Sequence, residues 1–342
     1  MKRLLYLGYY FKKLDWTLMD KFVDHVSGKY RKSRAALWSD ILYASLTYNI
    51  SLLEYFYFRF YRLSPAERGS FAGTGYMYEY QLLMNPRKYR KYLEDKRLFL
   101  KRFEKFVKHD YAALEDLRQA NGAGERLFEN PSGKLVLKSH DGQCGWGVEV
   151  VETSAFDAAS LVNHLEKTGN DLVEEYVVQH PAIMALSPSG LNTVRIFTQL
   201  NDRDEVELLG CRLRISVNSV VDNMAAGNLA APIDDETGVV NGPGVYSDIT
   251  KEEEAVHPIT GVPIEGFQVP YWEETLELVR QAAKSIPECR SVGWDVAVTG
   301  QGPELIEGNH DWCKLVWQLP VKRGLKPILE KHKTAYHRAS NT

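Results

Sequence analysis

The stretch that decides the fold is GWDVAV at residues 293–298, followed by ELIEGN at residues 304–309. We expect two neighbouring strands, each of which delivers an acidic side chain, Asp295 and Glu307, to the same edge. Glu307 and Asn309 are two residues apart, so along a strand their side chains share one face. Carboxylate and amide oxygens suit Mg²⁺, which takes a few protein oxygens together with substrate phosphates. The stretch therefore predicts a magnesium site rather than a structural acidic hairpin, in which a buried Glu307 would be costly without a partner.

A second candidate site follows the predicted strand at residues 135–138. Lys138 ends this strand and leads into a loop with glycines at three positions, Gly142, Gly145 and Gly147. Glycines let backbone N–H groups approach phosphates closely, and the lysine adds a point charge. The spacing matches neither the dinucleotide-binding fingerprint nor the P-loop. The pattern predicts a phosphate-binding loop, and a glycine-rich hairpin is the alternative.

A third candidate is the apolar strand predicted at residues 171–178. It carries Glu174 and Glu175 and is followed by Gln179 and His180. A strand of this kind can hydrogen-bond an adenine edge through its backbone and a ribose through a side chain. Taken alone, it is equally a half-buried strand.

The order of predicted elements favours an α+β enzyme over a parallel, doubly wound fold. Aromatic and basic helices are expected over residues 1–62, and a strongly charged helix over residues 86–109. From residue 127 onward the pattern changes to short strands separated by glycine turns. Helices are expected at 157–168 and 271–285, and further strands at 192–198, 207–215 and 293–298.

Charge is distributed unevenly along the 342 residues, although the net charge is only −3. Residues 1–110 carry 22 Lys and Arg against 11 Asp and Glu, so the remainder is acidic. The basic, aromatic helices either lie on a membrane surface or pack against the rest of the protein. No zinc-like or paired cysteine spacing is present among the four cysteines, and no cleavable signal is evident. We expect a cytoplasmic protein that does not bind nucleic acid.

The order of these motifs resembles that found in the ATP-grasp enzymes. Lys96 comes first, followed by Lys138 with its glycine loop, the Glu174–Val177 strand and the 295–309 motif. Several sequence segments are similar to those of one branch, the sugar-transfer-associated ATP-grasp proteins found with bacterial capsule and glycan genes. The phrases that carry this resemblance are LNTVRIFT (191–198), VDNMAAGN (221–228), IDDETG (233–238), GWDV (293–296) and IEGN (306–309). The resemblance covers roughly residues 64–320.

This resemblance implies an α+β ATP-grasp fold, in which two subdomains clasp ATP behind a helical N-terminal region. The N-terminal region would span residues 1–95 and the lid subdomain residues 96–180. A C-terminal subdomain with the metal site would span residues 181–330, and residues 331–342 would form a tail.

The resemblance also implies roles for residues that bind the nucleotide. Lys96 and Lys138 would bind the ATP phosphates, and the loop from Gly142 to Gly147 would close over them. Glu174 or Glu175, with the backbone near Val177, would bind adenine. Gln179 or His180 stands where many relatives place an acidic residue for the ribose.

For catalysis, the resemblance implies that Asp295, Glu307 and Asn309 hold one or two Mg²⁺ ions. Arg195 would face the γ-phosphate or an acyl phosphate, because a fork-shaped guanidinium suits a bidentate oxyanion. Lys138 would assist it.

The implied reaction is an ATP-dependent ligation. A carboxylate attacks the γ-phosphate of ATP, and an amine then displaces phosphate from the resulting acyl phosphate. The substrates would be a small or sugar-derived carboxylic acid and an amine, as in bacterial polysaccharide biosynthesis. Two alternatives remain at this stage: a phosphotransferase acting on a sugar or small molecule, and a non-catalytic nucleotide-binding component of a glycan assembly complex.

Overall fold

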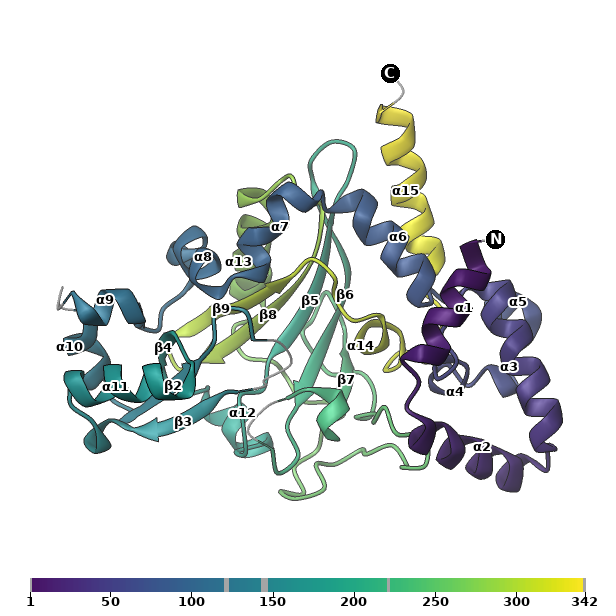
Figure 1. The fold of residues 1–342 in the computed structure, drawn as a ribbon, viewed down its shortest axis with the longest axis horizontal. Coiled ribbons are helices and arrows are strands. Elements are labelled where there is room, and N and C mark those ends of the chain that lie inside the picture. Colours follow the sequence, from purple (N-terminus) through teal and green to yellow (C-terminus); the bar gives the residue numbers. More distant parts are fainter. Residues whose placement is uncertain (1, 120–122, 143–146, 220–221, 341–342) are drawn as a thin grey trace.

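The structure is a computed structural model that describes residues 2–119, 123–142, 147–219 and 222–340 (Figure 1). Its longest axis runs from a small sheet covered by helices, through a large twisted sheet, to a helical N-terminal region. The described ends of the chain, in α1 and α15, lie on the helical side of the molecule. Helices and antiparallel sheets together make an α+β fold, as the sequence predicts.

The N-terminal region is helical throughout. A buried aromatic cluster holds its first part together, and the side chains of Tyr55, Phe56 and Phe60 are fully buried in it. Ser64 and Glu67 form a capping box that starts one of the helices. The helices that precede the first strand are α1 (Lys2–Lys12), α2 (Trp16–Tyr30), α3 (Arg34–Tyr48), α4 (Glu54–Tyr57), η1 (Phe60–Arg62), α5 (Pro65–Gly69), α6 (Thr74–Met84), α7 (Arg87–Glu94), α8 (Lys96–Arg102) and η2 (Glu104–Phe106).

The single helix expected over residues 86–109 is wrong, because the chain breaks it at Asp95 and its second part, α8, ends at Arg102. The Asp95 side chain accepts hydrogen bonds from the backbone N–H groups of Arg97 and Leu98 and so caps a new helix, α8. A capping carboxylate stabilises the N-terminus of a helix. The consequence is that Lys96 stands in the first turn of α8.

The small sheet has the strand order β1-β4-β2-β3, and all of its pairings are antiparallel. Leucines from its strands and helices form a core on one face, including Leu135, Leu137, Leu161 and Leu165. The elements are β1 (Tyr111–Ala113), α9 (Leu114–Arg118), α10 (Ala123–Phe128), β2 (Lys134–Lys138), β3 (Glu149–Glu152), η3 (Thr153–Ala155), α11 (Ala158–Thr168) and β4 (Leu172–Glu175). The strand expected to continue to residue 178 ends at Glu175.

The large sheet has the order β7-β6-β5-β8-β9, again fully antiparallel. Leu276, Val279 and Ala283 of α13 pack against its apolar face, where Val194 and Trp294 lie. The elements are α12 (Pro181–Leu186), β5 (Val194–Leu200), β6 (Val206–Ile215), η4 (Met224–Ala226), β7 (Leu229–Ile233), α13 (Trp272–Ser285), β8 (Ser291–Thr299), β9 (Gly302–Asn309), α14 (Lys314–Gln318) and α15 (Lys326–Ser340). Residues 331–340 of the expected tail continue α15 as a helix.

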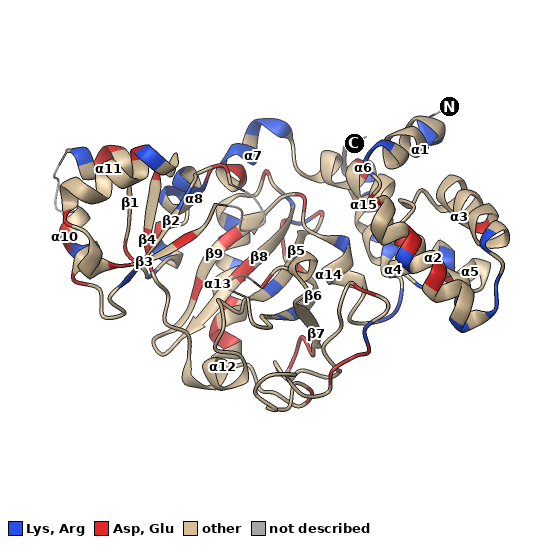
Figure 2. Ribbon diagram, turned by 60° about the horizontal axis from the view of Figure 1, so that its bottom comes forward, with Lys and Arg blue, Asp and Glu red and all other residues tan. Residues whose placement is uncertain are grey.

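The opposite face of the large sheet is polar at its centre. Arg195 of β5 lies opposite Asp295 of β8, and Asp295 in turn lies opposite Glu307 of β9. Residues directly opposite each other in antiparallel strands project from the same face. Figure 2 shows acidic segments on β8 and β9 beside basic segments on β5 and β6. The register therefore concentrates opposite charges on one side of the sheet.

The helical region is joined to the rest of the chain by a buried ion pair. The carboxylate of Glu54 in α4 is 2% exposed and lies 3.0 Å from the ammonium nitrogen of Lys314 in α14. The same carboxylate accepts hydrogen bonds from the backbone N–H groups of Ser51 and Thr74 and from the Thr74 hydroxyl. The pair fixes α4 against the segment that follows β9.

Candidate active site

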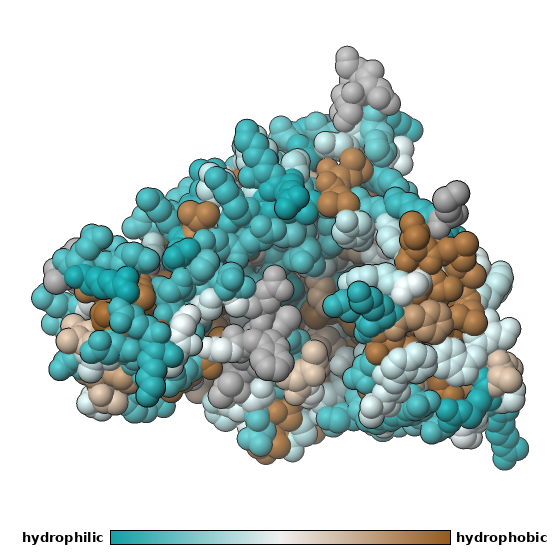
Figure 3. Space-filling model, viewed as in Figure 1, coloured by the Kyte–Doolittle hydropathy of each residue, from teal (hydrophilic) through white to brown (hydrophobic). Residues whose placement is uncertain are grey.

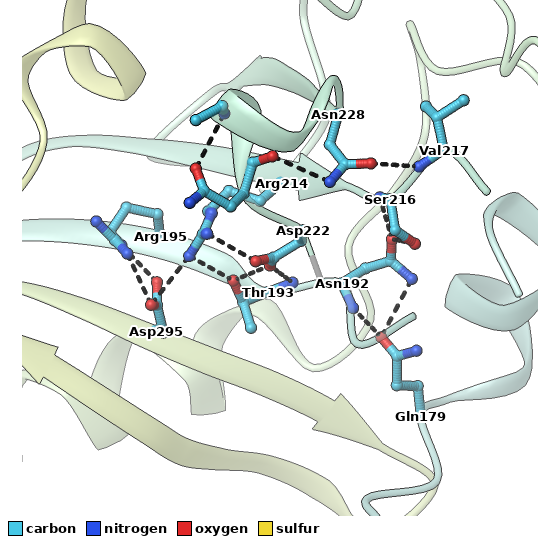
Figure 4. A network of polar contacts seen from close by, with 12 residues as sticks. Gln179, Asn192, Thr193, Arg195, Arg214, Ser216, Val217, Asp222, Asn228 and Asp295 are labelled. Atoms are coloured by element: carbon cyan, nitrogen blue, oxygen red, sulfur yellow. Dashed lines mark hydrogen bonds and ion pairs between the residues drawn. The ribbon is translucent and has the colours of Figure 1, made fainter. Parts of the chain in front are cut away.

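Two arginines hold one buried carboxylate at the centre of the large sheet (Figure 4). Arg195 donates to both oxygens of Asp295, with Nη2 2.7 Å from Oδ2. Arg214 of β6 donates from Nη1 to Oδ2 of the same carboxylate at 3.0 Å. Its other amino group lies 2.7 Å from Oδ1 of Asp222. All four side chains are at least 88% buried, so this is a desolvated charge network.

The charges of this network act on the carboxylates in opposite directions. Burial would raise the pKa of Asp295, but Arg195 and Arg214 outweigh it and hold the pKa below its usual value. For Glu307, burial and the neighbouring charge of Asp295 raise the pKa. In the described part of the chain, the side chain of Glu307 has no hydrogen bond or ion pair. Glu307 is therefore the acidic group of this site that most lacks a cation.

Asn192 and Thr193, which directly precede β5, hold the network in place through hydrogen bonds. Thr193 donates from its backbone N–H to Oδ2 of Asp222 at 2.9 Å, and its hydroxyl donates to the same oxygen. Asn192 accepts from the backbone N–H of Ser216 at 2.8 Å and donates to the carbonyl of Ser187. Thr193 thus orients Asp222, which orients Arg214, and Asn192 fixes the ends of β5 and β6 to each other (Figure 4).

Two lysines approach from the small-sheet side. Lys138, at the end of β2, lies 2.6 Å from Oε2 of Glu174 on the paired strand β4. Lys96 donates to the carbonyl of Gly142, at the start of the glycine loop. Burial lowers the pKa of Lys96, and the charge of Glu307 opposes that effect. Lys96 is thus close enough to Glu307 and Lys138 for their charges to act on its pKa in opposite directions.

His109 connects the two sheets through a chain of buried charges. Its Nδ1 lies 2.7 Å from Oε2 of Glu304 on β9, and its Nε2 lies 3.4 Å from Oε2 of Glu174 on β4. Burial would lower the pKa of His109, but the carboxylates of Glu174 and Glu304 raise it to about 9. The same Glu304 oxygen accepts the backbone N–H groups of Lys108 and His109. A protonated His109 therefore ties the small sheet to the large sheet.

The carboxylates of Glu174 and Glu175 both bind groups of the protein itself. Burial would raise the pKa of Glu174, but Lys138 and His109 lower it to about 2. Glu175 accepts from the backbone N–H of Asp110 at 3.2 Å. Val177 lies after the end of β4 and is half-buried.

The two residues expected near the ribose anchor the backbone instead of standing free. Gln179 is 4% exposed, donates to the carbonyl of Gly190 at 2.8 Å and accepts from the backbone N–H of Asn192 at 2.7 Å. His180 accepts from the backbone N–H of Ala182 and caps α12. Both side chains hold the segment that leads from the small sheet through α12 to β5.

The glycine loop is described only at its two ends. Gly142 contacts Lys96, and Gly147 has a φ of +74°, a conformation that favours glycine. Gly145 lies outside the described residues. The start of the loop is fixed by His140, whose backbone N–H donates to Asp171 at 2.8 Å.

The donor set around Glu307 fits a nucleotide with a hard cation. The amide nitrogen of Asn309 and Nε of Arg214 are buried without a hydrogen-bond partner in the described residues, and both require an acceptor such as a phosphate oxygen. Among the described residues, no three His, Cys, Asp or Glu side chains converge so as to hold a metal alone. The residues present thus suit Mg²⁺ that keeps phosphate oxygens among its ligands.

These networks include four residues to which the sequence motifs assigned no role. Asp222 lies within a quoted motif, whereas the other three, Arg214, His109 and Glu304, lie outside the motifs. Asp222 falls inside the VDNMAAGN phrase, which is one of those that carry the family resemblance. Arg214 lies two residues after Arg212 in β6. The alternation of side chains along a strand places both arginines on one face, so the sequence pattern does not distinguish Arg214 from Arg212. His109 carried no local signal, because its partners are 65 and 195 residues away.

With this geometry established, comparison with known proteins defines first the class and then the family. A family model described as sugar-transfer associated ATP-grasp matches residues 76–334. The chain therefore belongs to the ATP-grasp class, and within it to the sugar-transfer associated ATP-grasp family. No match was found among curated protein sequences.

Several solved structures are similar to this chain. Biotin carboxylase from Campylobacter jejuni has a TM-score of 0.45 at 13% identity and covers 72% of this chain and 47% of its own. D-alanine–D-alanine ligase from Bacillus anthracis has a TM-score of 0.39 at 16% identity, with coverages of 72% and 68%. An ADP complex of N5-carboxyaminoimidazole ribonucleotide synthetase has a TM-score of 0.40 at 10% identity, with coverages of 64% and 45%. The chain spans about half the length of the first and third of these proteins.

Proposed function

We propose that this protein is an ATP-dependent carboxylate–amine ligase that acts through an acyl phosphate on a sugar-derived substrate in the cytoplasm. The observation that carries the proposal is the pair of arginines, Arg195 and Arg214, held by Asp295 beside Glu307. Membership of the sugar-transfer associated family supports the substrate class. The preorganised cations support a reaction in which negative charge develops on transferred oxygens.

In this proposal the chain's own residues bind and orient the reactants. Lys96 and Lys138 bind the phosphates of ATP from the small-sheet side. Asp295 holds the guanidinium groups of Arg195 and Arg214 in place, so their N–H groups that are not bound to it, such as Nε of Arg214, would need little reorganisation to stabilise the oxyanions of the substrate acid and the γ-phosphoryl group. Glu307 and Asn309, with Asp295, would hold Mg²⁺, which when bound neutralises phosphate charge.

The bond changes balance without a covalent step on the protein. An oxygen of the substrate carboxylate attacks the γ-phosphorus of ATP, the bond to the β-phosphate oxygen breaks, and ADP leaves. The amine nitrogen then attacks the acyl carbon, phosphate departs, and the nitrogen loses a proton. The site supplies positioning and charge stabilisation for both steps, which is the contribution typical of phosphoryl-transfer enzymes.

The test is a turnover assay on the full chain with ATP, Mg²⁺ and a panel of uronic acids and amines. We expect ADP and phosphate in equal amounts only when an acid and an amine are both present. With hydroxylamine as the amine, the acid should be converted to its hydroxamate. A stable phosphorylated product without free phosphate would contradict the ligase and identify a phosphotransferase.

A matched pair of lysine variants links turnover to the site. Lys138→Ala should lower turnover by about 100-fold, the order of loss when one preorganised charge is removed. Lys134→Ala removes a lysine from the same strand, four residues earlier, and should leave turnover within about twofold. Equal activity in the two variants would contradict the role given to Lys138.

A further inference from the structure

The first helix presents an apolar face to solvent, away from the proposed active site. In α1 the side chains of Leu4, Leu5 and Tyr9 are 62%, 72% and 54% exposed. Gly8 has no heavy atom within 4 Å of where its Cβ would be, so this face is open at its centre. Figure 3 shows an apolar area on the helical side of the molecule, where α1 lies. Trp16, at the start of α2, is 52% exposed and stacks on Phe11.

The opposite face of α1 is firmly packed, so the exposed face has a fixed orientation. Tyr10 is 5% exposed in the aromatic cluster, and Tyr6 packs against the same cluster and contacts Tyr78 of α6 edge-to-face. Arg3 donates to the carbonyls of Leu46 and Thr47 at the end of α3. The apolar face is therefore presented by a helix that is held in place by α3 and α6.

Among the described residues, positive charge without a counter-ion lies at the C-terminal end of this face, whereas at the other end Lys2 pairs with Glu79 at 2.8 Å and Arg3 faces α3. Residues 2–13 contain four Lys and Arg and no Asp or Glu. Lys12 and Lys13 are exposed and have no ion pair in the described part of the chain. A second copy of the chain, docked with its α1 helix in the same direction, would bring Lys12 and Lys13 of the two copies together. An anionic surface with an apolar interior complements the face in both respects.

We propose that α1 is an interfacial anchor that binds the surface of an anionic lipid bilayer. Leu4, Leu5 and Tyr9 would enter the boundary between head groups and acyl chains, and Lys12 and Lys13 would contact lipid phosphates. Within the described residues, no helix has the length and apolarity to cross a bilayer, so the contact is peripheral. This inference is independent of the ligase proposal, because it rests on α1 alone.

The experiment is co-sedimentation of the full chain with vesicles at low ionic strength. We expect the protein to pellet with vesicles of equal parts phosphatidylcholine and phosphatidylglycerol and to stay in solution with phosphatidylcholine alone. Leu5→Glu should lower the partition coefficient by about tenfold or more, because it removes a buried leucine side chain and adds a repelled charge. Lys12→Glu combined with Lys13→Glu should lower it by at least as much, since each lysine near the surface contributes about fivefold.

The control variant is Ile259→Glu, which alters a similarly exposed apolar side chain, 66% exposed, outside α1. It should bind vesicles like the wild type, and all variants should keep the wild-type melting temperature. Failure of the wild type to pellet with anionic vesicles would overturn the proposal, as would wild-type binding by Leu5→Glu. A wild-type dimer that Leu5→Glu dissociates, without vesicle binding, would assign the face to a second copy.

Discussion

At the scale of single residues, the two carboxylates of the site differ in what they lack. Asp295 accepts three hydrogen bonds from two arginines, whereas Glu307, directly opposite it across the strand pair, accepts none in the described residues. A buried ion pair is strongly destabilised when only one partner is removed. Glu307 is half-buried, and a carboxylate removed from water without a partner is costly because nothing balances its charge. Neutralising Asp295 should therefore lower the stability of the protein, whereas neutralising Glu307 should leave it unchanged or raise it.

Asp295→Asn should destabilise the protein, because it leaves Arg195 and Arg214 buried without their shared counter-ion. We expect a loss of about 3–5 kcal/mol in the free energy of unfolding, measured by denaturant titration. Asp202→Asn, at an exposed position, should change it by less than about 0.5 kcal/mol. Similar values for the two variants would show that the arginine clamp is not a structural ion pair.

Glu307→Gln should leave the stability of the ligand-free protein unchanged or raise it, because burial and Asp295 already oppose ionisation there. It should abolish the rise in melting temperature that Mg²⁺ with a non-hydrolysable ATP analogue produces in the wild type. The exposed Glu104→Gln is the matched control and should keep the rise. A full rise in Glu307→Gln would remove Glu307 from the metal site.

At the scale of elements, the β8–β9 pair positions the acidic groups, and a tryptophan covers it closely. A Cβ added to Gly293, two residues before Asp295, would lie 2.6 Å from Cβ of Trp312. Trp312 is 1% exposed and contacts Phe197, so it has little freedom to move. Gly293 is thus required by the close approach of the segment that follows β9.

Gly293→Ala should cost about 1–3 kcal/mol in the free energy of unfolding, as overpacking of a core does. Gly300→Ala, in the turn between the same two strands, meets no atom within 4 Å and should cost less than about 0.5 kcal/mol. Thermal unfolding of both variants provides the comparison. Equal melting temperatures would mean that Trp312 moves aside without loss.

Much of this level of structure could be predicted from local sequence pattern. The strands around Lys138 and Asp295 follow from short apolar runs, and the helix α13 follows from its amphipathic periodicity. The break at Asp95 was missed because the charged pattern continues through it, while a single capping carboxylate decides where α8 begins. The pairing of Arg214 with Asp295 was not predictable, because it depends on the register of β5 between two distant strands.

At the scale of the whole molecule, one histidine links the two sheets between which the nucleotide site is proposed. His109 lies between Glu304 of the large sheet and Glu174 of the small sheet, and Glu174 also holds Lys138. The proton on His109 therefore affects both the joint between the sheets and a lysine of the site. Sequence pattern gave no indication of this link, since its members come from three distant segments.

The raised pKa of His109 gives the stability of the protein a defined pH dependence. The folded pKa of about 9 exceeds the usual value of 6.5, so the stabilisation is complete below about pH 6.5 and is lost as pH rises through about 9. We expect a loss on the order of 3 kcal/mol, followed as the fall in melting temperature between pH 6 and 10.

Comparison of two histidine variants isolates this effect. His109→Gln should flatten the pH dependence of the melting temperature in that window, because the titrating group is gone. His337→Gln, at an exposed position in α15, should keep the wild-type slope. A wild-type slope in His109→Gln would assign the alkaline loss to other groups.

The ion pair between Glu54 and Lys314 sets a limit on how this chain can be divided. The family match begins at residue 76, which suggests excision of the helices before it as a simple way to obtain an autonomous ATP-grasp module. Such a cut would strand the Lys314 ammonium against a newly uncovered apolar surface, where Ile249 and Leu315 now pack on the aromatic cluster. The helical region is therefore part of the packed unit, because it covers this surface and supplies the counter-ion of Lys314.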